Sequence, residues 1–267
     1  MSIISLLSDF GVKDAYVAEM KAVIFSINPQ ARIIDITHAI EKFSVRMGAY
    51  VLASAAPYFP PKTVHVAVVD PGVGTKRRPI IVETKRSLYV GPDNGLLMMA
   101  AHKEEIINVH TIDNPKYLLP KVSRTFQGRD IFAPAAAYLA TGVAPSAFGP
   151  AIHDYIFPEF AKPHTKKGEI VGEVHHIDDF GNVIGNISAE DLETAGFHEG
   201  DSLRVTVSGK TLNLQFCLAY GDVPVDAPLA LIGSSNFIEV AVNQGSASRI
   251  FKAKVGDTFR VYAVASR

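Results

Sequence analysis

The sequence predicts an α/β protein, in which a mostly parallel sheet with helices on both faces is followed by a smaller antiparallel, barrel-like β domain. In the first half, continuous apolar runs of strand length alternate with segments of helical spacing, which is typical of βαβ units. Residues 157–168 are polar and contain prolines, which favours a linker. After them, short strand-like runs separated by turn residues indicate a second sheet. We therefore predict an N-terminal domain at residues 1–156 and a C-terminal domain at residues 169–267.

The strands of the N-terminal domain are predicted from apolar, β-branched runs at residues 3–8, 31–37, 63–69, 80–84, 88–90 and 106–110. One helix is expected after Asp14, and others at residues 44–56, 96–103 and 130–140. Asp14 is expected to cap the first helix, because apolar residues recur at helical spacing from Val17 onward. Pro57 and Pro60 are expected to end the second helix.

The C-terminal domain is predicted to be built from short strands joined by tight turns such as residues 208–210, Ser-Gly-Lys. The runs that indicate these strands lie at residues 170–177, 183–187, 203–207, 212–216, 229–232, 238–242 and 259–264. Because strands follow one another without helices of comparable length, we expect a small, mostly antiparallel sheet or barrel.

Composition excludes several classes of function. Lys and Arg together number 26 against 27 Asp and Glu, so no general positive field attracts nucleic acid or an anionic membrane. No apolar run approaches the ~18–20 residues of a membrane span, and Met1–Phe10 lacks the pattern of a secretory signal. The single Cys217 cannot form an internal disulfide, which fits a reducing, cytoplasmic location.

Two aspartates follow predicted parallel strands, where open α/β sheets bind their ligands. Asp9 comes after residues 3–8 and before Gly11, and Asp70 comes after residues 63–69 and before a glycine-rich stretch. A carboxylate beside closely approaching backbone suits the paired hydroxyls of a ribose. The alternative for Asp9 is a cap on a turn.

Residues 70–78 read Asp-Pro-Gly-Val-Gly-Thr-Lys-Arg-Arg and lack the spacing of both the Walker loop and the dinucleotide fingerprint. What remains is Asp70 with Arg77 and Arg78 on one short loop. Such a pairing can keep Asp70 ionised and stabilise a second anion nearby. Alternatively, the two arginines are surface charges or clamp the loop.

Further polar segments are candidates for binding. Gly128 leaves room for a ligand before a helix that Asp130 is expected to cap, and Phe180 and Asn182 offer an aromatic face and an amide suited to a purine. Residues 234–237 and 243–246 are rich in hydroxyls and amides, for binding or as turn chemistry alone. The run His-His-Ile-Asp-Asp at residues 175–179 is discounted as a metal site, because strand alternation sends neighbours to opposite faces.

Together these segments resemble one family, the S-adenosylmethionine (SAM) hydroxide adenosyltransferases, which are adenosine-forming SAM hydrolases related to the fluorinase and chlorinase. The resemblance covers nearly the whole chain, and it is specific because several motifs occur in one order across both domains. These motifs lie at residues 8–11, 69–75, 91–96, 126–134, 178–182 and 243–246.

The resemblance implies a homotrimer whose sites lie between the N-terminal domain of one subunit and the C-terminal domain of its neighbour, with SAM as substrate and with no metal or other cofactor. It implies that Asp9 holds the ribose and that Phe180 and Asn182 receive the adenine. Asp178 and Ser234 would hold the methionine end. Phe43, Gly128, Asn243 and Gln244 complete the implied substrate-binding set.

The region around the nucleophile departs from the family at one position. Hydrolases of the family carry Asp, Arg and His to handle water, and Asp70 and Arg77 match the first two, but Gln127 stands in place of the histidine. Since Gln cannot accept a proton at neutral pH, two alternatives to SAM hydrolysis remain open. One is a SAM-binding protein with little or no turnover, and the other is a halide-using transferase, which the charge of Asp70 disfavours. A different nucleoside substrate is a more distant alternative.

Overall fold

The computed structural model describes residues 2–166 and 168–263. The chain divides into two compact units, Met1–Pro158 and Glu159–Arg267.

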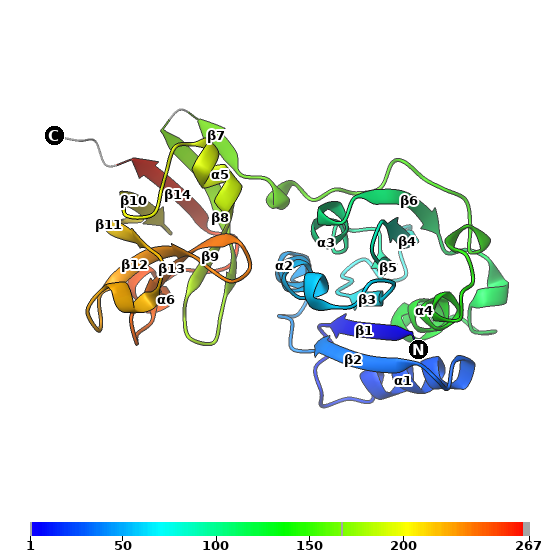
Figure 1. Ribbon diagram of the computed structural model, residues 1–267. Coiled ribbons are helices and arrows are strands. Elements are labelled where there is room, and N and C mark those ends of the chain that lie inside the picture. Colours follow the sequence, from blue (N-terminus) through cyan, green and yellow to red (C-terminus); the bar gives the residue numbers. More distant parts are fainter. Residues whose placement is uncertain (1, 167, 264–267) are drawn as a thin grey trace. The chain divides into compact units, whose positions relative to one another are not determined.

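A six-stranded sheet in the order β2-β1-β3-β5-β4-β6 forms the centre of the N-terminal unit (Figure 1). Its strands β2, β1, β3 and β5 are parallel neighbours, whereas β4 runs antiparallel to β5 and β6. The prediction of a mostly parallel sheet is therefore confirmed. The strands are β1 (Ile3–Ser8), β2 (Arg32–Thr37), β3 (Val64–Val68), β4 (Pro79–Thr84), β5 (Leu88–Pro92) and β6 (Ile106–Thr111).

Helices cover both faces of this sheet, which explains why its central strands are buried and mostly apolar. In Figure 1, α1 (Tyr16–Ile27) and α4 (Ala133–Ala140) pack together on one face, and α2 (Val45–Ala55) and α3 (Met98–Lys103) on the other. Leu6 on β1 belongs to the core under α1 and α4, whereas its neighbour Leu7 lies beside Gly48 of α2. Alternate residues of one strand thus fill two separate cores.

Two predicted helix caps are wrong. The N-cap of α1 is Ala15, without a side-chain hydrogen bond, because the helix begins one residue too late for Asp14 to reach its first free N–H groups. Asp130 does not cap a helix either. It lies inside the π-helical turn η3 (Gly128–Phe132), where its buried carboxylate accepts a hydrogen bond from the Ser123 N–H at 2.7 Å.

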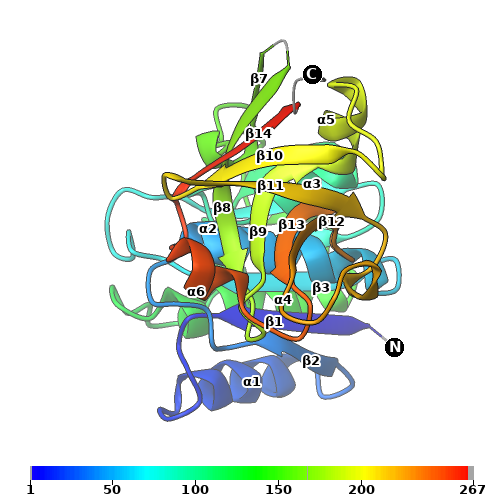
Figure 2. The same cartoon turned by 90° about the vertical axis from the view of Figure 1, so that its left-hand side faces the viewer.

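The C-terminal unit is a closed β-barrel. Its strands follow the order β14-β10-β11-β12-β13-β9-β8-β7, and a further pairing of β14 with β8 closes the barrel, so that β7 stays outside it. All pairings are antiparallel except that of β11 with β12, and Figure 2 shows β8, β9, β13 and β12 side by side. The strands are β7 (His164–Lys166), β8 (Glu169–Ile177), β9 (Val183–Ser188), β10 (Ser202–Val207), β11 (Lys210–Cys217), β12 (Pro228–Ile232), β13 (Phe237–Val242) and β14 (Thr258–Ala263).

The structure adds elements that the sequence pattern did not indicate. The segment predicted as a linker contains the turn Glu159–Ala161 and β7, which pairs with β8. Two short helices, α5 (Ala189–Thr194) and α6 (Ala247–Phe251), interrupt the run of strands. They were missed because five or six residues are too few to show a helical period. Residue 264, the last of a predicted strand, lies outside the described residues.

Candidate active site

A cavity of about 350 Å³ lies at the carboxyl edge of the N-terminal sheet. The parallel neighbours β1 and β3 end side by side there, with Ser8 opposite Val68, so Asp9 and Asp70 emerge at the same edge. Five residues predicted for the site line this cavity, and they come from four separate segments. They are Asp9, Phe43, Asp70, Gln127 and Gly128.

Asp70, Arg77 and Gln127 form one hydrogen-bonded group. The Arg77 Nε donates to Asp70 Oδ1 at 3.2 Å, and its Nη2 donates both to Asp70 Oδ2 and to Gln127 Oε1. The side chains of Asp70 and Arg77 are only 5% and 7% exposed. Arg77 does not line the cavity, so it acts from behind Asp70 and Gln127, which do.

A tight turn brings Arg77 back to Asp70. The Asp70 carbonyl accepts a hydrogen bond from the Val73 N–H, and the Thr75 hydroxyl donates to the Gly72 carbonyl at 2.7 Å. Gly74 has φ +77°, and a Cβ there would lie 2.5 Å from the Arg124 carbonyl oxygen, so only glycine fits. Gly74 is therefore required by the turn that places Arg77.

The pKa of Asp70 is raised above its ordinary value. Burial is the main cause, and the nearby Asp9 carboxylate adds to it, while Arg77 acts in the opposite direction. A carboxylate with a raised pKa binds a proton more readily than a solvated one does. The pairing with Arg77 was predicted to keep this group ionised, and it offsets burial only in part.

Arg78, the other arginine of the loop, belongs to a separate cluster. Its guanidinium donates to the buried Asp93 carboxylate at 2.7 Å and to Asp154 at 2.7 Å. Arg78 thus clamps the loop, which is one of the alternatives that the sequence left open for this residue.

Asp9 is held at the rim of the cavity. Its side chain accepts a hydrogen bond from the Phe43 N–H at 2.9 Å, and its carbonyl accepts one from Lys42 Nζ. Phe43 has φ +66° and is 67% exposed beside the cavity. A buried carboxylate next to an exposed aromatic ring is suited to hold a polar sugar against an apolar wall.

Gly128 lines the cavity at a closely packed point of its wall, and its role in leaving room for a ligand stays a prediction. A Cβ at this position would lie 3.3 Å from both the Phe10 ring and the Met20 sulfur. Phe10, Tyr16 and Phe126 form a cluster of edge-to-face and tilted rings, with centroids 5.0–5.7 Å apart. These rings line the cavity and were not predicted, because nothing in their spacing separates them from ordinary core aromatics.

In the C-terminal unit, Asp178, Phe180 and Asn182 share one turn after β8. Asp178 accepts hydrogen bonds from the Asn182 main-chain and side-chain N–H groups, both at 2.9 Å. Phe180 is 80% exposed. Ser246 packs against this turn, since a Cβ on Gly181 would lie 2.1 Å from the Ser246 Oγ.

The other predicted residues of this unit are Ser234, Asn243 and Gln244. Within residues 159–166 and 168–263, none of their side chains forms a hydrogen bond with the turn that holds Phe180. Ser234 and Gln244 are exposed, and the Asn243 side chain donates to the Val223 carbonyl at 2.8 Å, which holds the loop in place.

One buried carboxylate of this unit, Glu239, was not predicted from the sequence. Glu239 accepts a hydrogen bond from the Tyr220 hydroxyl at 2.7 Å, and burial together with Asp178 raises its pKa. The sequence feature that could have indicated Glu239 is that it is the one acidic residue in the otherwise apolar strand β13.

Within the described ranges, no group of three or more His, Cys, Asp or Glu residues is arranged to hold a metal ion. Nor does that part of the chain contain a helix with the length and apolar character needed to cross a membrane.

Comparison with known proteins agrees with this architecture. The SAM hydroxide adenosyltransferase N-terminal domain matches residues 4–149, and the corresponding C-terminal domain matches residues 172–260. The chain is 39% identical over 262 residues to a protein of Thermus thermophilus named (R)-S-adenosyl-L-methionine hydrolase, covering 96% of this chain and 97% of that one. It is 28% identical over 288 residues to a fluorinase of Actinoplanes sp., with 97% of each chain covered.

A crystal structure of an uncharacterized conserved protein from Thermotoga maritima superposes with a TM-score of 0.90. The two sequences are 39% identical, and the alignment covers 97% of this chain and 99% of that one. With matches to both family domains in order, the chain belongs to the SAM hydroxide adenosyltransferase family.

Proposed function

We propose that this chain hydrolyses S-adenosyl-L-methionine to adenosine and L-methionine, by in-line attack of water on the ribose C5′. The observation that carries this proposal is the cavity at the carboxyl edge, where Asp70 and Gln127 face a ligand space whose rim holds Asp9. The names of relatives with 35–39% identity over nearly the whole chain support the same reaction.

In this reaction the protein has to activate the attacking water and does not need to assist the leaving group. Methionine leaves as a neutral thioether, so no acid has to protonate it. Free water has a pKa of about 15.7 and is a weak nucleophile. Asp70 accepts the proton as water attacks, because burial raises its pKa. Arg77 positions Asp70 and Gln127, and Asp9 accepts hydrogen bonds from the ribose hydroxyls.

The substrate-binding residues of the C-terminal unit are assigned by their resemblance to the family. We propose that Phe180 stacks on the adenine and Asn182 contacts its edge, and that Asp178 and Ser234 hold the methionine end. Asn243 and Gln244 support the same region. The exposed ring of Phe180 is consistent with a stacking surface.

We further propose a cytoplasmic homotrimer in which a neighbouring subunit completes each site. The family resemblance supports this assembly, and the single Cys217 agrees with a reducing compartment. No metal or other cofactor takes part in the proposed reaction, since an aspartate and a water molecule suffice for the displacement.

The experiment is a product analysis. The purified protein is incubated with SAM, with and without chloride, and adenosine, methionine and 5′-chloro-5′-deoxyadenosine are separated by chromatography. We expect adenosine and methionine in equal amounts, independent of chloride. Chlorinated nucleoside would instead identify a halide-using transferase, and calorimetric binding of SAM without any product would identify a binding protein.

A further inference from the structure

Gln127 replaces the family's histidine, and its contact with Arg77 decides how its amide is oriented. A guanidinium has only N–H donors, so the atom of Gln127 that meets Arg77 Nη2 must be the carbonyl oxygen. The amide nitrogen, Nε2, therefore points away from Arg77. It has no hydrogen-bond partner among residues 2–166 and 168–263, and Gln127 lines the cavity.

The two polar side chains that meet this ligand space thus have opposite character. Asp70 presents only acceptors when it is ionised, whereas Gln127 has its oxygen engaged by Arg77 and keeps its amide N–H groups as donors for the ligand space. A water molecule between them can give a proton to Asp70 and accept a hydrogen bond from Gln127 Nε2, whereas an ionised Asp70 has no proton to give to the water. A histidine at this position could exchange a proton with water, and an amide cannot.

We propose that Gln127 is a catalytic hydrogen-bond donor, whose Nε2 orients the attacking water so that its proton passes to Asp70 alone. This inference rests on the proposed function. In the step, the water O–H bond breaks as the proton moves to the Asp70 carboxylate, and the oxygen forms a bond to C5′. The C5′–S bond breaks with its electron pair going to sulfur, which leaves as neutral methionine. Asp70 then returns its proton to solvent.

Three substitutions separate this role from a merely structural one. Gln127→Glu keeps an acceptor for Arg77 but removes the donor, and Gln127→Met removes both while keeping the length of the side chain. Gln127→His reintroduces a group that titrates. Gln215→Glu is the matched control, because it makes the same chemical change at an exposed strand position outside the site.

We expect kcat to fall on the order of 10–100-fold in Gln127→Glu and Gln127→Met, with KM nearly unchanged, since a donor to a reacting oxygen is lost. In the unaltered protein, log kcat should show a single ionisation, that of Asp70, and Gln127→His should add a second one near neutral pH. Gln215→Glu should behave as the unaltered protein does. Circular dichroism and calorimetric SAM binding check that each variant is folded.

Each outcome has a definite meaning. If Gln127→Glu and Gln127→Met keep the unaltered kcat and pH profile while adenosine is still formed, the donor role is overturned and the proposed function stands. If only Gln127→Met loses activity, Gln127 is a support for Arg77, which also overturns the donor role. If the unaltered protein forms no adenosine, the proposed function is wrong and this inference with it.

Discussion

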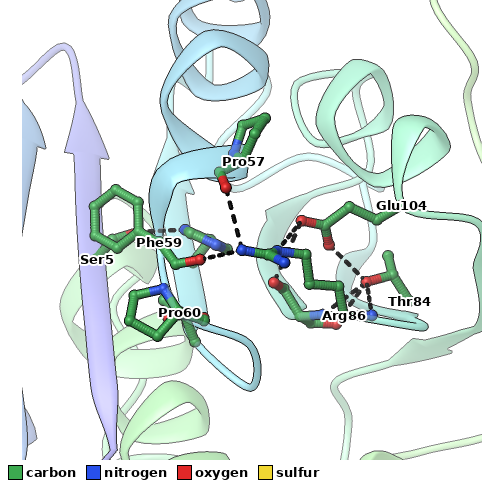
Figure 3. Close-up of polar contacts among 10 residues, drawn as sticks. Ser5, Pro57, Phe59, Pro60, Thr84, Arg86 and Glu104 are labelled. Carbon is green, nitrogen blue, oxygen red and sulfur yellow. Dashed lines mark hydrogen bonds and ion pairs between the residues drawn. The ribbon is translucent and has the colours of Figure 1, made fainter.

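The two ends of the N-terminal sheet each bring an arginine next to a buried carboxylate, yet only the carboxyl end holds the residues proposed here for catalysis. At the carboxyl end, Asp70 and Gln127 meet a cavity while Arg77 holds both from behind. At the amino end, Arg86 lies 3.7 Å from Glu104 and donates to the main-chain carbonyls of Pro57 and Phe59 (Figure 3).

A larger cavity, about 660 Å³, lies at the amino end and not at the candidate site. Arg86 and Thr84 line it, but both are engaged: Thr84 Oγ1 lies 2.8 Å from Glu104 Oε2, and Arg86 ties the α2–β3 connection to the β4–β5 turn. Volume therefore does not locate the site. What distinguishes the carboxyl end is a base with a raised pKa and a donor without a protein partner, both facing the same space.

The strongest test of this contrast is Asp70→Asn. Because the amide cannot accept the proton of water, we expect adenosine release to fall about 10²–10⁴-fold. SAM binding should stay within a few-fold, since Asp70 is not assigned to hold the substrate. Chromatography gives the rate and calorimetry the affinity. Activity retained in this variant would remove Asp70 from the mechanism and with it the distinction between the two ends.

The second test concerns His65 near the amino end of the sheet. Its Nδ1 lies 2.7 Å from the Ser5 hydroxyl, and both residues are fully buried. Burial, with a smaller effect of Arg86, lowers the His65 pKa to about 4. The stability it contributes is therefore complete above its unfolded pKa of ~6.5 and is lost as the pH falls from there toward the folded value.

This loss should amount to roughly 2–3 kcal/mol of unfolding free energy. Urea unfolding at several pH values measures it. His65→Gln, which retains a partner for Ser5, should flatten the dependence over this range. An equally steep dependence in that variant would assign the acid sensitivity to other groups.

A smaller effect is expected from Glu104→Gln. Losing the charged acceptor of Thr84 and the ion pair with Arg86 should lower the unfolding free energy by about 1–2 kcal/mol. The rate of SAM hydrolysis at a temperature where the variant is folded should not change. A fall in kcat with unaltered stability would mean that the amino end of the sheet takes part in catalysis.

The smallest effect is expected from Asp9→Asn. The amide oxygen can still accept the Phe43 N–H, so the loop should stay in place. Hydrogen bonds from the ribose hydroxyls would weaken by about 1 kcal/mol on loss of the charge, raising KM about five- to tenfold with little change in kcat. Steady-state kinetics separates the two constants. A fall in kcat with constant KM would place Asp9 in the chemical step.

Much of the architecture could be predicted because its signals are local. Apolar strands buried on both faces and a succession of short strands indicated both sheets, and the order of Asp9 and Asp70 after β1 and β3 placed them at one edge. The cap at Asp14 was wrong because a one-residue difference in where a helix begins carries no clear pattern, and the cap at Asp130 was wrong because the sequence did not indicate the π-helical turn that contains this residue. A glycine in a turn such as that at Gly74 is expected from residue preferences, but its close approach to the Arg124 carbonyl could not be read from the sequence.

The sequence by itself determined the fold class and the family, and it singled out the aspartate, arginine and glutamine proposed here for catalysis. Only the tertiary structure decided that Arg77 lies behind Asp70 and Gln127, that Arg78 belongs to a separate cluster, and that the Gln127 oxygen faces Arg77. The physical reason is that a hydrogen bond between residues 50 positions apart depends on how the chain returns to itself, whereas strand and helix signals depend on neighbouring residues.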